Sequence, residues 1–247
     1  MRPLLRVALA SLFVLAFRPA AANEVNLVTL DWPPYSGAVP NQGFLSVVLR
    51  EAYATQGHSV SVKVLPWLRA IKVTMSGARN SPLGFYSASQ QECTDANGRT
   101  SDPIGYYQFY LAQRKGGQST WRQWSDLHGK RIGVIEGYDN GPDIARLGSQ
   151  SLIVLDAAPN DLSSLQKLAA KRVDYAVTDA RVFEHLQKVH SLTSLELAAR
   201  PVTGRLPLYV CFNRTPSAEA MRLVLNEGLK QVNVETIAQT YLRPASR

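Results

Sequence analysis

The sequence lacks most of the short motifs by which common enzyme classes are recognised. Its 247 residues include two cysteines and four histidines, without a CxxC pair or an HExxH motif, so no zinc site is expected. A GxGxxG loop, a Walker loop and a GxSxG elbow are also missing. These absences exclude the easily recognised nucleotide-binding and hydrolase classes, and no metal or cofactor is predicted.

Concentrated positive charge is also missing, although the chain is basic. Lys and Arg number 27 against 19 Asp and Glu, a net charge of +8, which raises the question of a nucleic-acid or membrane partner. The basic residues are scattered singly, and the densest piece is Arg114-Lys115. A solvated surface explains this distribution better than a nucleic-acid-binding stripe, so no nucleic-acid partner is expected.

The first 22 residues have the pattern of a secretory signal peptide. Arg2 and Arg6 precede an apolar run over 7–17, and an A-x-A-like end at 20–22 predicts cleavage before Asn23. A membrane anchor is the alternative, but about 11 apolar residues are too few to span roughly 30 Å of hydrocarbon. The segment holds three arginines and no acidic residue, so its removal lowers the net charge from +8 to +5.

The two cysteines, Cys93 and Cys211, stand 118 positions apart. Export makes a disulfide between them possible. Sequence alone does not show whether the two thiols are close in space, so a bridge and two free thiols both remain open.

Strand-type and helix-type patterns alternate along the rest of the chain, which indicates an α/β fold. Short apolar or alternating runs predict strands over 25–30, 59–64, 131–135, 152–155, 173–177 and 208–212, with a long extended run over 104–113. Helical spacing and capping residues predict helices that start near 44, 66, 142, 161, 180 and 217, followed by a last helix that ends at 242.

These elements form two βαβ-type groups in succession, each with too few strands for a large sheet. The simplest architecture is two small α/β lobes: lobe 1 begins over 23–107, lobe 2 covers 108–206, and 207–247 returns to complete lobe 1. The return is expected because two crossings between lobes make a hinge, whereas one makes only a tether.

Six segments of the chain contain recognisable motifs in a fixed order: 25–37, 43–57, 62–77, 101–115, 126–138 and 165–182. The most specific is DLHGKRIGVIEGY at 126–138, with a Leu-x-Gly-Lys-Arg-Ile-Gly-Val core. A second carries an aromatic-x-Pro-aromatic turn, VNLVTLDWPPYSG, and a third carries a Pro-Trp-x-Arg-Ala segment. Together they resemble bacterial extracytoplasmic solute-binding proteins of the polar amino-acid transporter type (family 3), and the resemblance extends over nearly the whole mature chain.

The resemblance implies the two-lobed, type 2 periplasmic-binding-protein fold, with a ligand cleft between lobes joined by a two-strand hinge. It further implies a periplasmic monomer that closes on a small-molecule ligand and delivers it to an inner-membrane permease complex of the ABC type. Binding rather than catalysis is expected.

Two positions depart from the family pattern for amino-acid ligands. The arginine that holds the ligand's α-carboxylate falls here on Gln91 or Glu92, and neither supplies a cationic fork. In the loop after the Ile-Gly-Val strand, Asp139 stands where the family contacts the same carboxylate, which it would repel. Both departures argue against a ligand carboxylate.

Other candidate ligand contacts are an aspartate and several aromatic residues. Asp179 matches the family position for a ligand's ammonium group, and capping of the helix that begins at Ala180 is an equal alternative. Trp32 matches the position that stacks on the ligand. Burial in the lobe cores is the alternative for all the aromatic candidates, which are Trp32, Tyr35, Trp67, Phe85, Tyr86, Tyr107 and Tyr138. Such a set suits an amine, a quaternary ammonium group or a flat neutral ring.

Two other functions remain open. The first is an orphan or sensory binding protein that presents its ligand to a partner other than a permease. The second is a cyclohexadienyl-dehydratase-like enzyme of the same fold, in which Asp139, Asp179 or Glu92 would act as general acid. The missing arginine disfavours the enzyme, because its substrates carry carboxylates.

Overall fold

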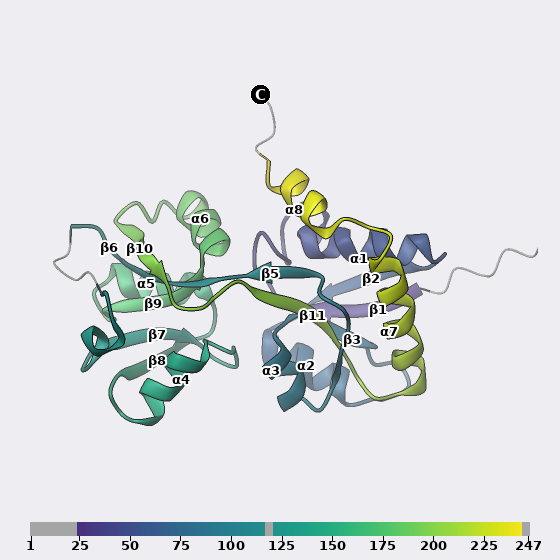
Figure 1. Ribbon diagram of the computed structural model, residues 1–247, viewed down its shortest axis with the longest axis horizontal. Helices are drawn as coiled ribbons and strands as arrows, with labels where there is room; N and C mark the ends of the chain where they lie inside the picture. Colours follow the sequence, from purple (N-terminus) through teal and green to yellow (C-terminus); the bar gives the residue numbers. More distant parts are fainter. Residues whose placement is uncertain (1–23, 117–120, 244–247) are drawn as a thin grey trace, which may run out of the picture.

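The computed structural model describes residues 24–116 and 121–243, so the predicted signal peptide lies outside the described residues. Two β-sheets, each flanked by helices, form two lobes side by side along the long axis of the molecule (Figure 1). We call the six-stranded sheet with its helices lobe 1, and the five-stranded sheet with its helices lobe 2. The predicted two-lobed α/β fold is therefore confirmed.

The sheet of lobe 1 is built on a parallel centre. β1 (Glu24–Thr29) lies between β2 (Ser59–Val64) and β3 (Gly84–Ala88) and is parallel to both. β11 (Leu206–Phe212), from late in the chain, pairs antiparallel with β3. Two short strands complete the sheet by pairing with β11: β4 (Arg99–Thr100) and β5 (Gly105–Tyr107).

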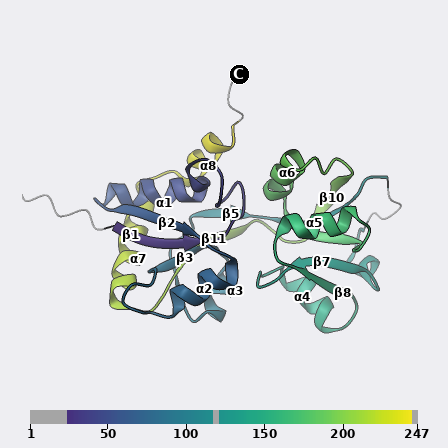
Figure 2. The same cartoon turned by 180° about the vertical axis from the view of Figure 1, so that it is seen from behind.

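The helices of lobe 1 lie on two sides of this sheet. α1 (Phe44–Thr55) packs against α7 (Pro216–Leu229) and α8 (Val234–Leu242). α1 and α7 approach so closely that a Cβ at Gly228 would lie 2.1 Å from the carbonyl oxygen of Ala52, which only glycine permits. On the side away from α1 lie α2 (Trp67–Met75) and α3 (Gln90–Asp95), as Figure 1 and Figure 2 show.

Lobe 2 has a mixed sheet with helices on both sides. Its strands in spatial order are β10 (Leu195–Pro201), β6 (Phe109–Arg114), β9 (Tyr175–Asp179), β7 (Arg131–Ile135) and β8 (Val154–Ala158). Its helices are α4 (Pro142–Ser149), α5 (Asp161–Ala169) and α6 (Ala180–Val189). α5 and α6 lie on the side of the sheet opposite to α4 (Figure 2).

Two segments cross between the lobes side by side. β5 continues through Gln108 into β6, and β10 returns through 202–205 into β11. The backbone N–H of Val202 donates to the carbonyl of Phe109 at 2.8 Å, and Gln108 Nε2 donates to the carbonyl of Thr203 at 3.0 Å. Paired crossings of this kind form a hinge about which the two lobes can open and close.

Two strands of lobe 2 begin two residues later than the sequence predicts. β8 begins at Val154 rather than at 152, because the N–H of Leu152 donates to the carbonyl of Leu147 and completes the end of α4. β9 begins at Tyr175 rather than at 173, because the carbonyl of Val173 accepts a hydrogen bond from the guanidinium of Arg114.

The N-terminus of α5 also differs from the prediction. Asn160, rather than Asp161 or Ser163, is the N-cap residue, and its side chain accepts a hydrogen bond from the N–H of Ser163 at 2.8 Å. Among the strands and α-helices of the described residues, β3, α3, β4 and β10 have no counterpart among the predicted elements. α3 has only six residues, QQECTD, which are too few and too polar to show helical periodicity.

Candidate functional site

A small cavity lies between the two lobes, with a volume of about 20 Å³. A cavity of this size holds one or two water-sized groups. Lobe 2 contributes Phe109, Tyr138 and Asp139, and the remaining lining residues belong to lobe 1: Leu30, Trp32, Trp67, Ser87, Ser89, Glu92, Tyr107 and Leu208. The cavity is thus formed only when the lobes are together.

Aromatic rings form much of the cavity wall. Trp32 meets Tyr107 and Tyr138 edge-to-face, with ring centroids 6.2 and 6.5 Å apart. Trp67 meets Tyr138 in the same manner at 6.3 Å. Because neighbouring rings are nearly perpendicular, they enclose adjacent sides of the cavity. The face of each aromatic ring attracts positive charge.

A tight turn after β1 sets the position of Trp32. The N–H groups of Trp32 and Ser36 each donate to the carbonyl of the other residue at 3.0 Å, and Ser36 Oγ donates to the carbonyl of Leu30. Tyr35, within this turn, stacks on Trp32 with ring centroids 4.3 Å apart. Tyr35 therefore supports Trp32 from behind and does not line the cavity itself.

Two carboxyl groups from different lobes meet in the cavity wall. Glu92 Oε1 accepts a hydrogen bond from the N–H of Asp139 at 3.2 Å. Ser89 joins them: its Oγ donates to Asp139 Oδ2 at 3.2 Å, and its N–H donates to Glu92 Oε2 at 2.7 Å. Burial between the lobes raises the pKa of Glu92 to about 7. The pair links α3 of lobe 1 to a loop of lobe 2.

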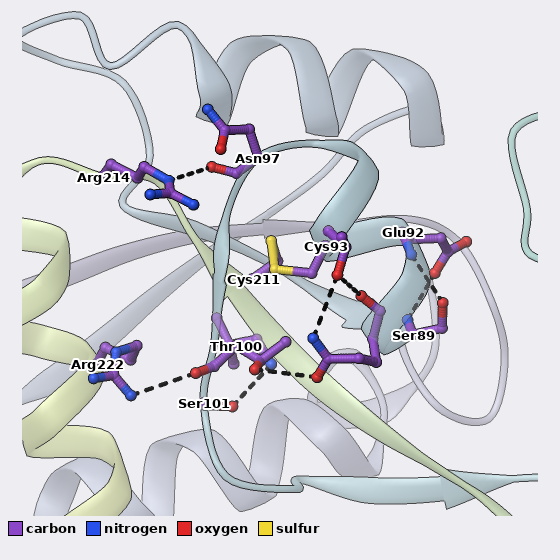
Figure 3. The surroundings of a disulfide bond; sticks show 12 residues. Ser89, Glu92, Cys93, Asn97, Thr100, Ser101, Cys211, Arg214 and Arg222 are labelled. Carbon is purple, nitrogen blue, oxygen red and sulfur yellow. Dashed lines mark hydrogen bonds between the residues drawn. A yellow bond between two sulfur atoms is a disulfide. The ribbon is translucent and has the colours of Figure 1, made fainter.

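Local sequence explains why Glu92 has this orientation. Ser89 and Glu92 form a capping box at the start of α3: Ser89 Oγ accepts from the N–H of Glu92, and the Glu92 carboxylate accepts from the N–H of Ser89. Figure 3 shows both residues at this helix end.

A disulfide holds α3 in place. Cys93, next to Glu92, is bonded to Cys211 of β11, with Cα atoms 5.4 Å apart (Figure 3). Gly98 makes room for the bridge, since a Cβ there would lie 2.2 Å from Cys211 Sγ. The disulfide therefore fastens the helix that carries Glu92 to a central strand of lobe 1.

The loop that carries Asp139 is held internally and docks on lobe 1. Asp139 Oδ1 accepts from the N–H of Gly141 at 3.1 Å, and Asn140 bonds both backbone groups of Ile135 through its side chain. Across the cleft, Trp67 Nε1 donates to the carbonyl of Gly137 at 3.1 Å. Together with the Ser89–Glu92–Asp139 contacts, this bond joins the lobes directly.

Two further carboxyl groups are buried at the interface, outside the cavity wall. Asp179 caps α6, where its Oδ1 accepts from the N–H groups of Arg181 and Val182, and its Oδ2 accepts from the N–H of Gln108. Burial raises the pKa of Asp179. Asp161 Oδ1 accepts a hydrogen bond from Thr178 Oγ1 at 3.4 Å. Burial, with the nearby Asp179 charge, raises the pKa of Asp161 to about 7.

Cations are scarce around these four carboxyl groups. Within residues 24–116 and 121–243, no ion pair includes Glu92, Asp139, Asp161 or Asp179. The guanidinium of Arg181 lies over the rings of Tyr35 and Phe44, 5.9 and 5.8 Å from their centroids. The cavity wall itself has two acidic residues and no basic one.

The structure brings together some of the predicted site residues and separates others. Trp32, Trp67, Tyr138 and Asp139 line the cavity. Tyr35 and Phe85 lie behind it, where Phe85 packs edge-to-face against Trp67.

The other three predicted residues lie away from the cavity. The hydroxyl of Tyr86 bonds Ser46 Oγ in the core of lobe 1. Gln91 is exposed, and its Nε2 donates to Asp95 Oδ1. Asp179 is 2% exposed, and backbone N–H groups occupy both of its oxygens.

Two more residues that the sequence analysis names also line the cavity, Tyr107 and Glu92. The rest of the lining was not predicted: Leu30, Ser87, Ser89, Phe109 and Leu208. The sequence contains a pattern that points to Ser89 and Glu92 together. Ser89-Gln90-Gln91-Glu92 is an S-x-x-E capping box, which places the serine and glutamate side chains at one helix end. No local pattern distinguishes Ser87 or Leu208 from ordinary core residues.

The structure offers no metal or membrane site in its described parts. Among residues 24–116 and 121–243, no group of three His, Cys, Asp or Glu side chains is placed to hold a metal ion. The described helices include none with the length and apolar character needed to cross a membrane.

Comparison with known proteins shows the fold. No family model and no curated protein matches the sequence. An ancestral arginine-binding protein bound to arginine matches with a TM-score of 0.74 at 17% identity, over 90% of this chain and 99% of that chain. A structure from work on glutathione import through GshT and the cystine ABC importer TcyBC of Streptococcus mutans also matches. Its TM-score is 0.74 at 17% identity, over 90% of this chain and 95% of that chain.

A histidine kinase sensor domain with similarity to periplasmic binding proteins also matches, with a TM-score of 0.72 at 18% identity, over 90% of this chain and 96% of that chain. At these identities the likeness concerns the fold alone. The chain has the two-lobed fold of type 2 periplasmic binding proteins.

Proposed function

We propose that the protein is an exported, monomeric solute-binding protein that closes its lobes on a small polar solute and delivers it to an inner-membrane ABC permease. The observation that carries this proposal is the cavity whose wall is built from both lobes across a paired hinge. Clefts between lobes are favoured ligand sites, because closure removes the ligand from water on all sides.

The wall of the cavity supports an amine-like or aromatic solute rather than a carboxylate. Glu92 and Asp139 would repel an anionic group, and no basic residue lines the cavity to offset them. The ring faces of Trp32, Trp67 and Tyr138 suit a cation or a flat ring. The same wall supports binding rather than catalysis on carboxylate substrates.

Ligand entry requires the lobes to separate. The cavity of about 20 Å³ is smaller than most metabolites, and Trp67 and Ser89 bond directly to lobe 2 across it. Opening about the paired crossings would expose the aromatic wall, and a ligand would then replace some of these direct contacts when the lobes close.

A thermal-shift screen of the chain from Asn23 onward tests the proposal. Amines, quaternary ammonium compounds and small aromatic molecules are expected to raise the melting temperature, because a ligand that binds only the native state stabilises it more as its concentration rises above its dissociation constant. Substitution Trp32→Ala is expected to abolish the shift. A strong response to ordinary zwitterionic amino acids, or an unchanged affinity in Trp32→Ala, would contradict the proposed site.

A sensory role is the second candidate, and the likeness to a histidine kinase sensor domain favours it. The two roles differ in the partner that recognises the closed form. Uptake of radiolabelled ligand by cells that lack the protein would be lost if it serves a permease. Unchanged uptake together with an altered transcriptional response to the ligand would favour sensing.

A further inference from the structure

The cavity has two unmet chemical requirements that point to one class of ligand. Two carboxyl groups of its wall lack a cation among the described residues, and one N–H donor of its wall lacks an acceptor. The first calls for positive charge and the second for a hydrogen-bond acceptor. A ligand that meets both must carry two different groups.

The carboxyl oxygens have hydrogen bonds, but all from neutral donors. Glu92 accepts from the N–H groups of Ser89 and Asp139. Asp139 accepts from Ser89 Oγ and from the N–H of Gly141. Each carboxylate oxygen has a second lone pair, so each has room for another donor. A cationic donor would offset the negative charge that these neutral groups leave.

The unmet donor is the indole N–H of Trp32. Trp32 is 4% exposed and lines the cavity, and its Nε1 has no hydrogen-bond partner in the described structure. An indole N–H only donates, so an ammonium group cannot satisfy it. A carboxylate oxygen would satisfy it but would be repelled by Glu92 and Asp139. A neutral oxygen, such as a hydroxyl or a carbonyl, meets the requirement without that repulsion.

We propose that the cavity takes a small organic cation that also carries a neutral oxygen acceptor, the chemistry of an amino alcohol. The ammonium group binds Glu92 and Asp139, the oxygen accepts from Trp32 Nε1, and the carbon atoms between them lie against the neighbouring rings. This inference rests on the proposed solute-binding function and names the substrate class of the same site.

The surroundings of the cavity leave room for substituents on the ammonium nitrogen. A groove of about 460 Å³ lies beside the cavity and shares Glu92, Tyr138 and Asp139 with it. N-methyl or longer N-alkyl groups would extend toward this groove. The site thus accepts a series of amines that have the ethanolamine core in common.

Isothermal titration with matched small molecules tests the inference. 2-Aminoethanol and its N-methylated forms are expected to bind. Ethylene glycol, without the cation, is expected to bind about 10- to 150-fold more weakly, the range for a charge-assisted hydrogen bond. Ethylamine, without the acceptor, is expected to lose roughly 2- to 12-fold, the range for a neutral one. Glycine is expected not to bind.

Two variants connect these differences to the named side chains. Trp32→Phe is expected to bind 2-aminoethanol and ethylamine equally, because the indole donor is gone. Glu92→Gln preserves the capping box and is expected to bind 2-aminoethanol more weakly than the wild type does, because only the Asp139 carboxylate remains to hold the ammonium group. Gln90→Ala, an exposed change on the same helix, is the control and is expected to leave all affinities unchanged.

The outcomes separate this inference from the proposed function. If the protein binds only neutral aromatic molecules or only carboxylates, the amino-alcohol class is wrong while solute binding stands. Equal binding of ethylamine and 2-aminoethanol by the wild type would overturn the role of Trp32 Nε1. If no solute of any class binds to the folded protein, the proposed function fails as well.

Discussion

Two pairs of carboxyl groups lie at the interface between the lobes, and they differ in what surrounds them. Asp161 and Asp179 are 5% and 2% exposed and lie outside the cavity wall. Glu92 and Asp139 are partly exposed and form part of that wall. Both pairs include a group whose pKa is raised to about 7, namely Asp161 and Glu92. A raised pKa alone therefore does not distinguish a structural carboxyl from a ligand-binding one.

The distinction comes from the remaining hydrogen-bond capacity and from access. Asp179 accepts three backbone N–H bonds and closes the N-terminus of α6. Glu92 and Asp139 are also hydrogen-bonded, but they border a cavity from which a donor can approach them. We therefore assign a structural role to Asp179 and propose a ligand role for the Glu92–Asp139 pair.

Removal of the disulfide is expected to have the largest effect on stability, and it loosens the helix that carries Glu92. The double substitution Cys93→Ser and Cys211→Ser is expected to lower the free energy of unfolding by about 2–5 kcal/mol, because the bridge closes a long loop. Urea denaturation measures this loss. Ligand affinity should fall as well, since α3 loses its covalent tie. Equal stability of the variant and the oxidised wild type would contradict the role given to the bridge.

Substitution of Asp179 tests the structural role that we assign to this residue. Asp179→Ala leaves buried backbone N–H groups without an acceptor and is expected to cost roughly 2 kcal/mol of unfolding free energy. Asp179→Asn retains an acceptor oxygen and should cost less. Ligand affinity is expected to remain within about twofold in the folded Asn variant, a difference below 0.5 kcal/mol. Loss of binding in a stable Asp179→Asn protein would assign Asp179 to the ligand site instead.

The pH dependence of stability is expected to reveal both pairs. The pKa values of Glu92 and Asp161 are raised to about 7 from ordinary values of 4.5 and 3.8. At pH values between the ordinary pKa and the raised pKa of each group, the folded protein holds a proton that the unfolded chain has released. Their contribution to stability is therefore complete below the ordinary values and is lost as the pH rises through about 7.

Urea denaturation between pH 5 and 8 measures how the free energy of unfolding changes with pH. This slope reaches at most about 1.4 kcal/mol per pH unit for each proton. Glu92→Gln and Asp161→Asn should each flatten part of it. If neither substitution changes the slope, the two carboxyl groups do not have the raised pKa values on which this prediction rests.

The smallest expected effect concerns closure of the lobes. Trp67→Phe removes the hydrogen bond to the carbonyl of Gly137 and keeps an aromatic ring in the wall. Ligand affinity is expected to fall by roughly 2- to 12-fold, and the unfolding free energy should change little. Titration calorimetry measures the ligand affinity, and small-angle X-ray scattering measures the opening of the lobes. Trp124→Phe, away from the cavity, is the matched control. An equal loss of ligand affinity in Trp124→Phe would contradict the role of Trp67 in closure of the lobes.

Much of the fold could be predicted from local patterns. The strict alternation over 59–64 and the strand at 131–135 correspond to β2 and β7, and the helix after Asp179 corresponds to α6. Apolar periodicity does not reveal the short polar helix α3, because the helix has no apolar face, and its S-x-x-E capping box is the one local signal of it in the sequence. The disulfide that holds it in place depends on a long-range contact. This helix carries Glu92, so the missed element is also the one that completes the candidate site.

The candidate site could be predicted only in part, for a related reason. Trp32, Trp67 and Tyr138 are aromatic residues in recognisable segments, yet Tyr86 has the same character and its hydroxyl bonds Ser46 inside lobe 1. Side chains within one strand alternate between its two faces, and only the surrounding packing decides which face meets the cleft. Gln91 and Glu92 are adjacent in sequence, and the orientation of α3 places only Glu92 in the cavity wall.

The sequence by itself determined the α/β order of elements and the presence of two lobes, because periodicity and capping act within a few residues. Only the tertiary structure decided which acidic groups border the cavity. Glu92 and Asp139 are 47 positions apart and lie on different lobes, and their contact forms only when the hinge brings the lobes together. Such a contact depends on long-range geometry, which no local pattern records.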